Sequence, residues 1–205
     1  MKPILTAMQG TNADLFPSVL SLYLPKGGRV LDMTFGRGVF WKNVDLSNIQ
    51  LIRNDIAKDL GEYHDDFRKT RWADGDFDMV VLDPPYAGRS GSPIKASIDR
   101  GYQIYERTRK LGVFGTDAVM VYYEDGMKEA RRVMKPKGVL AVKCMDEIMG
   151  GKQHLNHVTI LNTGTSLGFT VEDLFVLMQK GTPTMRHDYQ LHARKNHSYF
   201  LAFRK

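Results

Sequence analysis

The stretch from Met79 to Tyr86 reads MVVLDPPY, and it decides the fold class of this 205-residue chain. Four consecutive apolar residues predict a strand buried on both faces, which is typical of parallel sheets. The strand has to end at Asp83, because Pro84 and Pro85 cannot donate hydrogen bonds to a sheet ladder. The two prolines also fix the backbone, so a stiff turn follows the strand.

This turn places unusual chemistry at the end of a buried strand. Asp83 and the carbonyl of Pro84 are two neighbouring hydrogen-bond acceptors, which suit a group with two N–H donors such as an exocyclic amine. Tyr86 adds a flat face on which a planar ring can stack. The competing interpretation is a strand terminator with a helix-capping aspartate.

Apolar runs of strand length recur and alternate with amphipathic stretches of helical period. This alternation predicts an α/β fold with a mostly parallel sheet in a single domain spanning residues 1–205. The late strands are expected to close the sheet as a hairpin or as two separate strands. The expected strands are 29–32, 51–55, 79–82, 139–143, 169–178 and 198–203, and the expected helices are 14–24, 122–134 and 154–167.

Three aspartates stand at the ends of expected strands: Asp32, Asp55 and Asp83. In open α/β sheets ligands bind beyond the carboxyl ends of the strands. We therefore expect these three carboxylates to rim one crevice.

A glycine turn follows the first of these strands, in the sequence DMTFGRG from Asp32 to Gly38. Glycine lets the backbone approach a ligand closely, and we expect a helix after the turn. A dinucleotide fingerprint would need a third glycine at position 41, which is Trp41, so a nicotinamide or flavin site is not supported. Asp55 suits a carboxylate that accepts hydrogen bonds from a ribose diol. A tight turn with a capping aspartate is the alternative.

Positive charge gathers in two segments of a chain whose net charge is +6 and whose pI is about 9.3. The segment 87–119 interrupts the alternation and is predicted to be an inserted basic loop, and residues 180–195 interleave basic and aromatic side chains. Such segments suit a polyanionic partner such as nucleic acid, although solvated surface loops have the same composition.

Cysteine and histidine usage argues against a metal site. Cys144 is the single cysteine, which excludes an internal disulfide and a cysteine-based zinc site and is typical of the cytoplasm. His154 and His157 are interpreted as surface residues on one helix face. No apolar run approaches the length of a membrane span, so no membrane association is expected. The alternatives of a monomer and a homodimer stay open.

Taken together, these motifs resemble the S-adenosylmethionine-dependent amino-methyltransferases that act on nucleic-acid bases. Asp83-Pro84-Pro85-Tyr86 matches their [DNS]-P-P-[YF] motif, and the glycine turn is similar to their D-x-F-x-G-x-G cofactor motif, with Thr34 and Arg37 departing from the common residues. The resemblance implies a Rossmann-like methyltransferase fold with helices on both faces and a late antiparallel strand. It implies a catalytic role for Asp83, Pro84, Pro85 and Tyr86, and contacts to S-adenosylmethionine from Asn12, Asp14, Asp32, Thr34, Phe35, Gly36, Gly38, Asp55 and Asp66.

The same resemblance implies direct methyl transfer to a base amine. Substrate contacts are then expected from Arg89, Arg194, His197 and Tyr199, with DNA as the partner. Adenine N6 is favoured over cytosine N4. An RNA base methyltransferase, for example one that acts on guanine N2, and a non-catalytic binding protein are the alternatives.

Overall fold

The structure is a computed structural model that describes residues 3–84, 116–181 and 190–205. Its centre is a twisted seven-stranded sheet with the order β1-β8-β9-β5-β4-β2-β3. Strand β9 is antiparallel to both of its neighbours, and the other pairs are parallel. The strands are β1 (Ala7–Gln9), β2 (Gly28–Asp32), β3 (Ile49–Arg53), β4 (Phe77–Leu82), β5 (Met134–Cys144), β8 (Thr170–Met178) and β9 (His197–Arg204).

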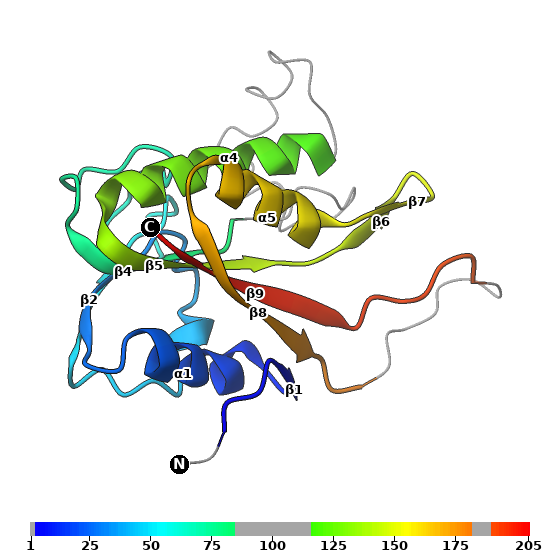
Figure 1. The fold of residues 1–205 in the computed structure, drawn as a ribbon, viewed down its shortest axis with the longest axis horizontal. Helices are drawn as coiled ribbons and strands as arrows, with labels where there is room; N and C mark the ends of the chain where they lie inside the picture. Colours follow the sequence, from blue (N-terminus) through cyan, green and yellow to red (C-terminus); the bar gives the residue numbers. More distant parts are fainter. Residues whose placement is uncertain (1–2, 85–115, 182–189) are drawn as a thin grey trace.

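Helices cover both faces of this sheet (Figure 1). Helix α1 (Asn12–Tyr23) lies on one face, and α4 (Thr116–Val133) and α5 (Asn156–Ser166) lie on the other. The short strands β6 (Glu147–Met149) and β7 (Lys152–His154) pair as a separate hairpin after β5. Among the described helices, none combines the length and the apolar character that crossing a membrane requires.

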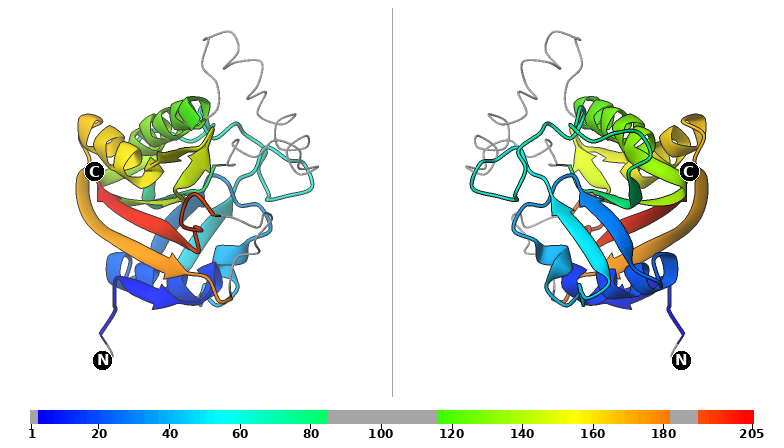
Figure 2. Two further views of the ribbon diagram at one scale, coloured as in Figure 1. Left: turned by 90° about the vertical axis from the view of Figure 1, so that its right-hand side faces the viewer. Right: turned by 90° about the vertical axis from the view of Figure 1, so that its left-hand side faces the viewer.

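The sheet separates two hydrophobic cores, because successive side chains of a strand point to opposite faces. Val30 and Val81 pack under α1 together with Phe16, whereas Leu31 and Leu82 pack against α4 and α5. The buried central strands therefore read as continuous apolar runs, as the sequence predicts for a parallel sheet. Figure 2 shows the sheet from its two ends, with α1 beneath it and α4 and α5 above.

The predicted α/β architecture is confirmed, with a mostly parallel sheet, an antiparallel strand late in the chain and helices on both faces. Three local predictions are wrong. The glycine turn is followed only by a 3-10 turn, η1 (Val39–Trp41), because Phe40 and Trp41 are drawn directly into the α1 core. His154 lies in β7 rather than on a helix with His157, and residues 116–119 of the expected loop already belong to α4.

Candidate active site at the carboxyl edge of the sheet

The carboxyl ends of β2, β3 and β4 lie side by side. Asp32 pairs in register with Arg53 of β3 and with Val81 of β4, so the residues that follow these strands emerge at one edge. Asp32, Asp55 and Asp83 stand at this edge, as the sequence predicts, and the negative charges of Asp55 and Asp83 both act on Asp32.

The glycine turn and the D-P-P turn are joined by a hydrogen bond. The backbone N–H of Asp83 donates to the Thr34 hydroxyl oxygen at 2.7 Å. Pro84 is buried and Asp83 is half-buried. Since neither Pro84 nor Pro85 has an N–H, the Asp83 amide is the last main-chain donor before the two prolines, and Thr34 accepts from it.

Asp32 is buried beneath this turn, with 1% of its surface exposed. Its carboxylate accepts hydrogen bonds from the Trp41 indole N–H at 2.7 Å and from the Thr34 backbone N–H at 3.1 Å. Burial raises the pKa of Asp32 to about 7, against the opposing effect of these two donors, and the neighbouring carboxylates of Asp83 and Asp55 add to the rise. Asp32 thus serves as the internal anchor of the glycine turn.

The glycine turn forms an open cradle. Gly36 has φ of +55°, and the one described atom within 4 Å of a Cβ built there is the Thr34 carbonyl oxygen, at 3.9 Å. The Gly36 N–H donates to Asp55 Oδ2 at 2.9 Å, and the Ala57 N–H donates to Asp55 Oδ1 at 2.9 Å. Gly38 is needed for a different reason, because a Cβ there would lie 2.6 Å from the Phe35 ring.

Asn54 is a structural residue of this edge that the sequence analysis missed. It is fully buried, and its side-chain amide donates to the carbonyl oxygens of Met33 and Asp65 and accepts from the Asp65 N–H. It therefore ties the segment after β3 to the glycine turn. Asp66, one residue further on, is paired with the Arg68 guanidinium, so its carboxylate already has a cationic partner.

The N-terminus of α1 lies at the same edge, because β1 is parallel to β8 and ends there. Asp14 accepts hydrogen bonds from the backbone N–H and the hydroxyl of Thr11, both at 2.8 Å, and these bonds lower the pKa of Asp14. It closes a capping box. The Asn12 side-chain oxygen is buried and has no hydrogen-bond partner among the described residues.

On the other side of β4, the edge carries a buried cation. Lys143, near the end of β5, is 4% exposed and is the one buried lysine or arginine in the described part of the chain. Its ammonium donates to the Ser198 hydroxyl and lies 4.5 Å from the centre of the Phe200 ring. Burial lowers the pKa of Lys143 to about 8, and the charge of Asp83 opposes this.

Just after β5, Asp146 organises an aromatic cluster that the sequence analysis did not foresee. Asp146 Oδ1 lies 2.7 Å from His157 Nδ1, and Asp146 Oδ2 accepts from the Tyr199 hydroxyl at 3.3 Å. The rings of His157 and Tyr199 stack with centroids 4.3 Å apart, and His197 Nε2 lies 2.9 Å from the Tyr199 hydroxyl. His157 is therefore an internal partner rather than an ordinary surface residue.

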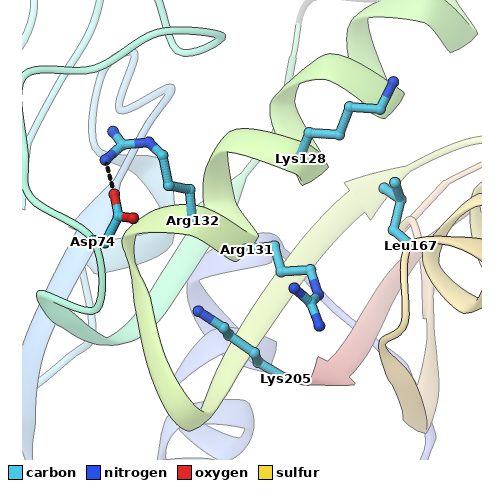
Figure 3. Close-up of a pocket in the computed structure, with 6 residues that line it drawn as sticks. All are labelled: Asp74, Lys128, Arg131, Arg132, Leu167 and Lys205. Atoms are coloured by element: carbon cyan, nitrogen blue, oxygen red, sulfur yellow. Dashed lines mark hydrogen bonds and ion pairs between the residues drawn. The ribbon is translucent and has the colours of Figure 1, made fainter.

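A basic surface pocket lies at the opposite edge of the sheet, where the strands begin (Figure 3). Its volume is about 480 Å³, and Lys128, Arg131, Arg132 and Lys205 line it with Asp74 and Leu167. Arg132 is bonded to Asp74 and Glu129, and it lies with Arg131 in the last turn of α4, where cations stabilise the helix dipole. These contacts give Arg132 a structural role.

Solved structures of other proteins resemble this chain in fold. The sequence matches no family model and no curated protein. An S-adenosylmethionine-dependent methyltransferase from Methanosarcina mazei is 12% identical over 91% of this chain and 96% of its own, with a TM-score of 0.55. The chain has the methyltransferase fold. A candidate methyltransferase from Bacillus halodurans is 12% identical over 92% of this chain and 97% of its own, with a TM-score of 0.57.

TrmN from Thermus thermophilus has the same fold, with 14% identity over 93% of this chain and a TM-score of 0.55. This chain spans about half of TrmN, 48% of its length. Within the methyltransferase fold, the structure gathers most of the sequence-predicted site residues at the carboxyl edge: Asn12, Asp14, Asp32, Thr34, Phe35, Gly36, Gly38, Asp55, Asp66, Asp83, Pro84, His197 and Tyr199.

Four predicted site residues are not in this group, because one is an exposed loop residue and three are not described. Arg194 is exposed in the segment before β9. Pro85, Tyr86 and Arg89 lie outside the described residues, as does most of the predicted basic insertion. In the described ranges, no group of three or more histidine, cysteine or acidic side chains could hold a metal ion.

Proposed function

We propose that the protein transfers a methyl group from S-adenosylmethionine to an exocyclic amine of a DNA base, with adenine N6 as the favoured target. The observation that carries the proposal is the hydrogen bond from Asp83 to Thr34. This bond joins the D-P-P turn to the glycine turn. The cofactor and the amine would then be held by two connected parts of the same edge. The fold and the sequence motifs support the same activity.

The residues present fit this cofactor. Among the described residues, the space over Gly36 is open, so a ligand can approach the main chain closely, and the Asn12 oxygen without a partner there offers an acceptor at the start of α1. Asp55 can accept from ribose hydroxyls, since each of its oxygens accepts one hydrogen bond from the described residues and a carboxylate oxygen can accept more than one. When bound, S-adenosylmethionine supplies an electrophilic methyl group on a sulfonium.

The proposed role of the chain is positioning and electrostatic stabilisation. Asp83 and the Pro84 carbonyl accept the two N–H groups of the amine, which directs the nitrogen lone pair toward the methyl group. They would also stabilise the positive charge that develops on nitrogen as the sulfonium C–S bond breaks, until the methylated nitrogen loses a proton to solvent. Orientation of this kind can supply on the order of 7–11 kcal/mol. A base in a duplex must first leave the stack, at a cost of a few kcal/mol, and stacking on Tyr86 would offset about 1–3 kcal/mol of it.

The test is transfer of labelled methyl groups from S-adenosylmethionine to duplex DNA and, separately, to total RNA. Mass spectrometry of the digested nucleosides then identifies the methylated base. We expect N6-methyladenine in DNA. Label in RNA alone would replace the DNA assignment by RNA base methylation, and label in neither would contradict the activity.

A paired variant tests the D-P-P turn. Asp83→Ala should reduce transfer at least a hundredfold while cofactor affinity, measured by calorimetry, changes little. Asp45→Ala is the matched control, because Asp45 is an exposed carboxylate in the segment before β3. Unchanged transfer by Asp83→Ala would contradict the proposed role of the turn.

A further inference from the structure

The buried ammonium of Lys143 has no place in the chemistry described so far. A buried lysine destabilises a fold unless its charge is compensated or used. Around Lys143, the described residues provide one hydrogen-bond acceptor, Ser198 Oγ, and the face of the Phe200 ring. An ammonium carries three N–H donors, so two are left over by the described residues for another acceptor.

Strand register places this donor beside the acceptors of the D-P-P turn. Leu82 of β4 pairs with Val142 of β5, so Asp83 and Lys143 are the next neighbours on adjacent parallel strands. Adjacent strands are about 4.8 Å apart. Lys143 points to the α1 face, where Ala141 and Phe200 also lie, and its electrostatic interaction with Asp83 agrees with this proximity.

Strand order also decides on which side of Asp83 the lysine stands. Thr34 and Asp55, two of the proposed cofactor residues, follow β2 and β3 on one side of β4. Lys143 and Ser198 belong to β5 and β9 on the other side. If the cofactor lies over β2 and β3, the target base has to reach Asp83 from the side of β5 and β9.

From these observations we propose that Lys143, held by Ser198, is a specificity-determining residue that donates a hydrogen bond to the ring nitrogen next to the target amine. The inference rests on the proposed function. Acceptors at Asp83 and Pro84 with a donor at Lys143 complement an amine followed by an unprotonated ring nitrogen. That pattern occurs on the Watson–Crick edge of adenine (N6 and N1) and of cytosine (N4 and N3). Flipped bases are read on this edge.

Deaza bases test the hydrogen bond itself. The substrate is a duplex that contains a site methylated by the wild-type protein, made with the natural target base or with its analogue that lacks the ring nitrogen, 1-deazaadenine or 3-deazacytosine. Wild-type protein should lose at least tenfold in kcat/KM on the analogue. On the natural base, the kcat/KM of Lys143→Met should be at least tenfold lower than that of wild type. On the analogue, the kcat/KM of this variant should fall by less than a further twofold.

Two controls separate this role from a structural one. Lys143→Met should retain the unfolding midpoint, since methionine replaces the buried stem without the charge, and should bind S-adenosylmethionine within twofold of wild type. Ser198→Ala should lower kcat/KM on the natural base by a smaller factor than Lys143→Met does, because the lysine keeps its donors but loses the acceptor that orients it.

The outcomes distinguish the two proposals. A wild-type protein that methylates neither DNA nor RNA overturns the proposed function and this inference together. Suppose instead that wild type methylates the natural base, and that the analogue lowers kcat/KM by the same factor for wild type and for Lys143→Met. This result overturns only this inference. In that case Lys143 would act as a counter-charge for Asp83 rather than on the base.

Discussion

The Thr34 hydroxyl oxygen accepts the backbone N–H of Asp83 at 2.7 Å, across 49 positions of sequence. One end of this bond belongs to the glycine turn after β2 and the other to the D-P-P turn after β4. The bond therefore sets the spacing between the part of the edge proposed for the cofactor and the part proposed for the amine.

Replacing this acceptor should uncouple the two turns. Thr34→Val keeps the shape of the side chain but leaves the Asp83 N–H without its acceptor, which should cost about 1–3 kcal/mol of unfolding free energy. Methyl transfer should fall more than tenfold, with a smaller change in cofactor affinity. Thr34→Ser, which keeps the hydroxyl, should retain most of the stability and most of the methyl transfer of wild type. Wild-type transfer by Thr34→Val would show that the bond does not position the turn.

The buried Asp32 predicts a pH-dependent stability. Its pKa of about 7 in the folded protein lies well above the value of about 3.9 expected for an unfolded chain. The unfolded state therefore loses this proton first, and stability falls as pH rises from about 4 to about 7. Asn cannot ionise, so the advantage of wild type over Asp32→Asn should shrink by about 2–3 kcal/mol between pH 5 and pH 8.

Urea denaturation at the two pH values, without cofactor, measures this difference. Asp45→Asn is the control, because Asp45 is exposed and its lowered pKa places its titration below this range. A wild-type advantage that is constant between pH 5 and pH 8 would mean that Asp32 stays ionised in the folded protein.

The Tyr199 hydroxyl should matter for substrate more than for folding. Tyr199→Phe removes the donor to Asp146 and the contact with His197, and should cost about 1 kcal/mol of stability. We expect a higher KM for nucleic acid. Burial and Asp146 raise the pKa of Tyr199 to about 12, so the hydroxyl stays protonated at neutral pH.

Tyr23→Phe provides the matched control. The Tyr23 hydroxyl also donates to a carboxylate, that of Asp173, but it lies at the end of α1 away from the candidate site. A similar stability loss with an unchanged KM is expected. Equal KM values for the two variants would argue against a substrate role for Tyr199.

Gly164 should reverse the usual preference for alanine in helices. It lies inside α5, where alanine is normally more stable by about 1 kcal/mol. Here a Cβ would lie 2.4 Å from Phe203 Cε1, so overpacking should destabilise Gly164→Ala by about 1–3 kcal/mol. Asn162→Ala, at an exposed position of the same helix, should be neutral or slightly stabilising. Thermal denaturation of both variants decides, and a more stable Gly164→Ala would contradict the close contact.

The sheet was predictable from the sequence because its central strands are apolar on both faces and end in recognisable turns. The carboxyl-edge position of Asp32, Asp55 and Asp83 follows from the same pattern. Contacts between residues far apart in the sequence could not be predicted, because they leave no pattern in the local sequence. His157 reads as a surface residue until β9 brings Tyr199 against it, and Lys143 reads as an ordinary strand end until Ser198 and Phe200 enclose it.

The glycine turn shows the opposite difficulty. Gly36 and Gly38 predicted a close-approach turn, and both have positive φ. The helix expected after Gly38 is only η1, because Trp41 is held inward by its hydrogen bond to Asp32. That bond joins two residues nine positions apart and has no counterpart in helical periodicity.

Because the sheet separates two cores, substitutions in the two cores have different effects on the candidate site. The core under α1 contains Trp41 and Phe200, which support Asp32 and Lys143, so its substitutions reach the candidate site directly. The core under α4 and α5 supports a different part of the site, because it contains Tyr199, which stacks on His157 of α5. Compensating changes can therefore be confined to one interior, and the same architecture is compatible with only 12% sequence identity.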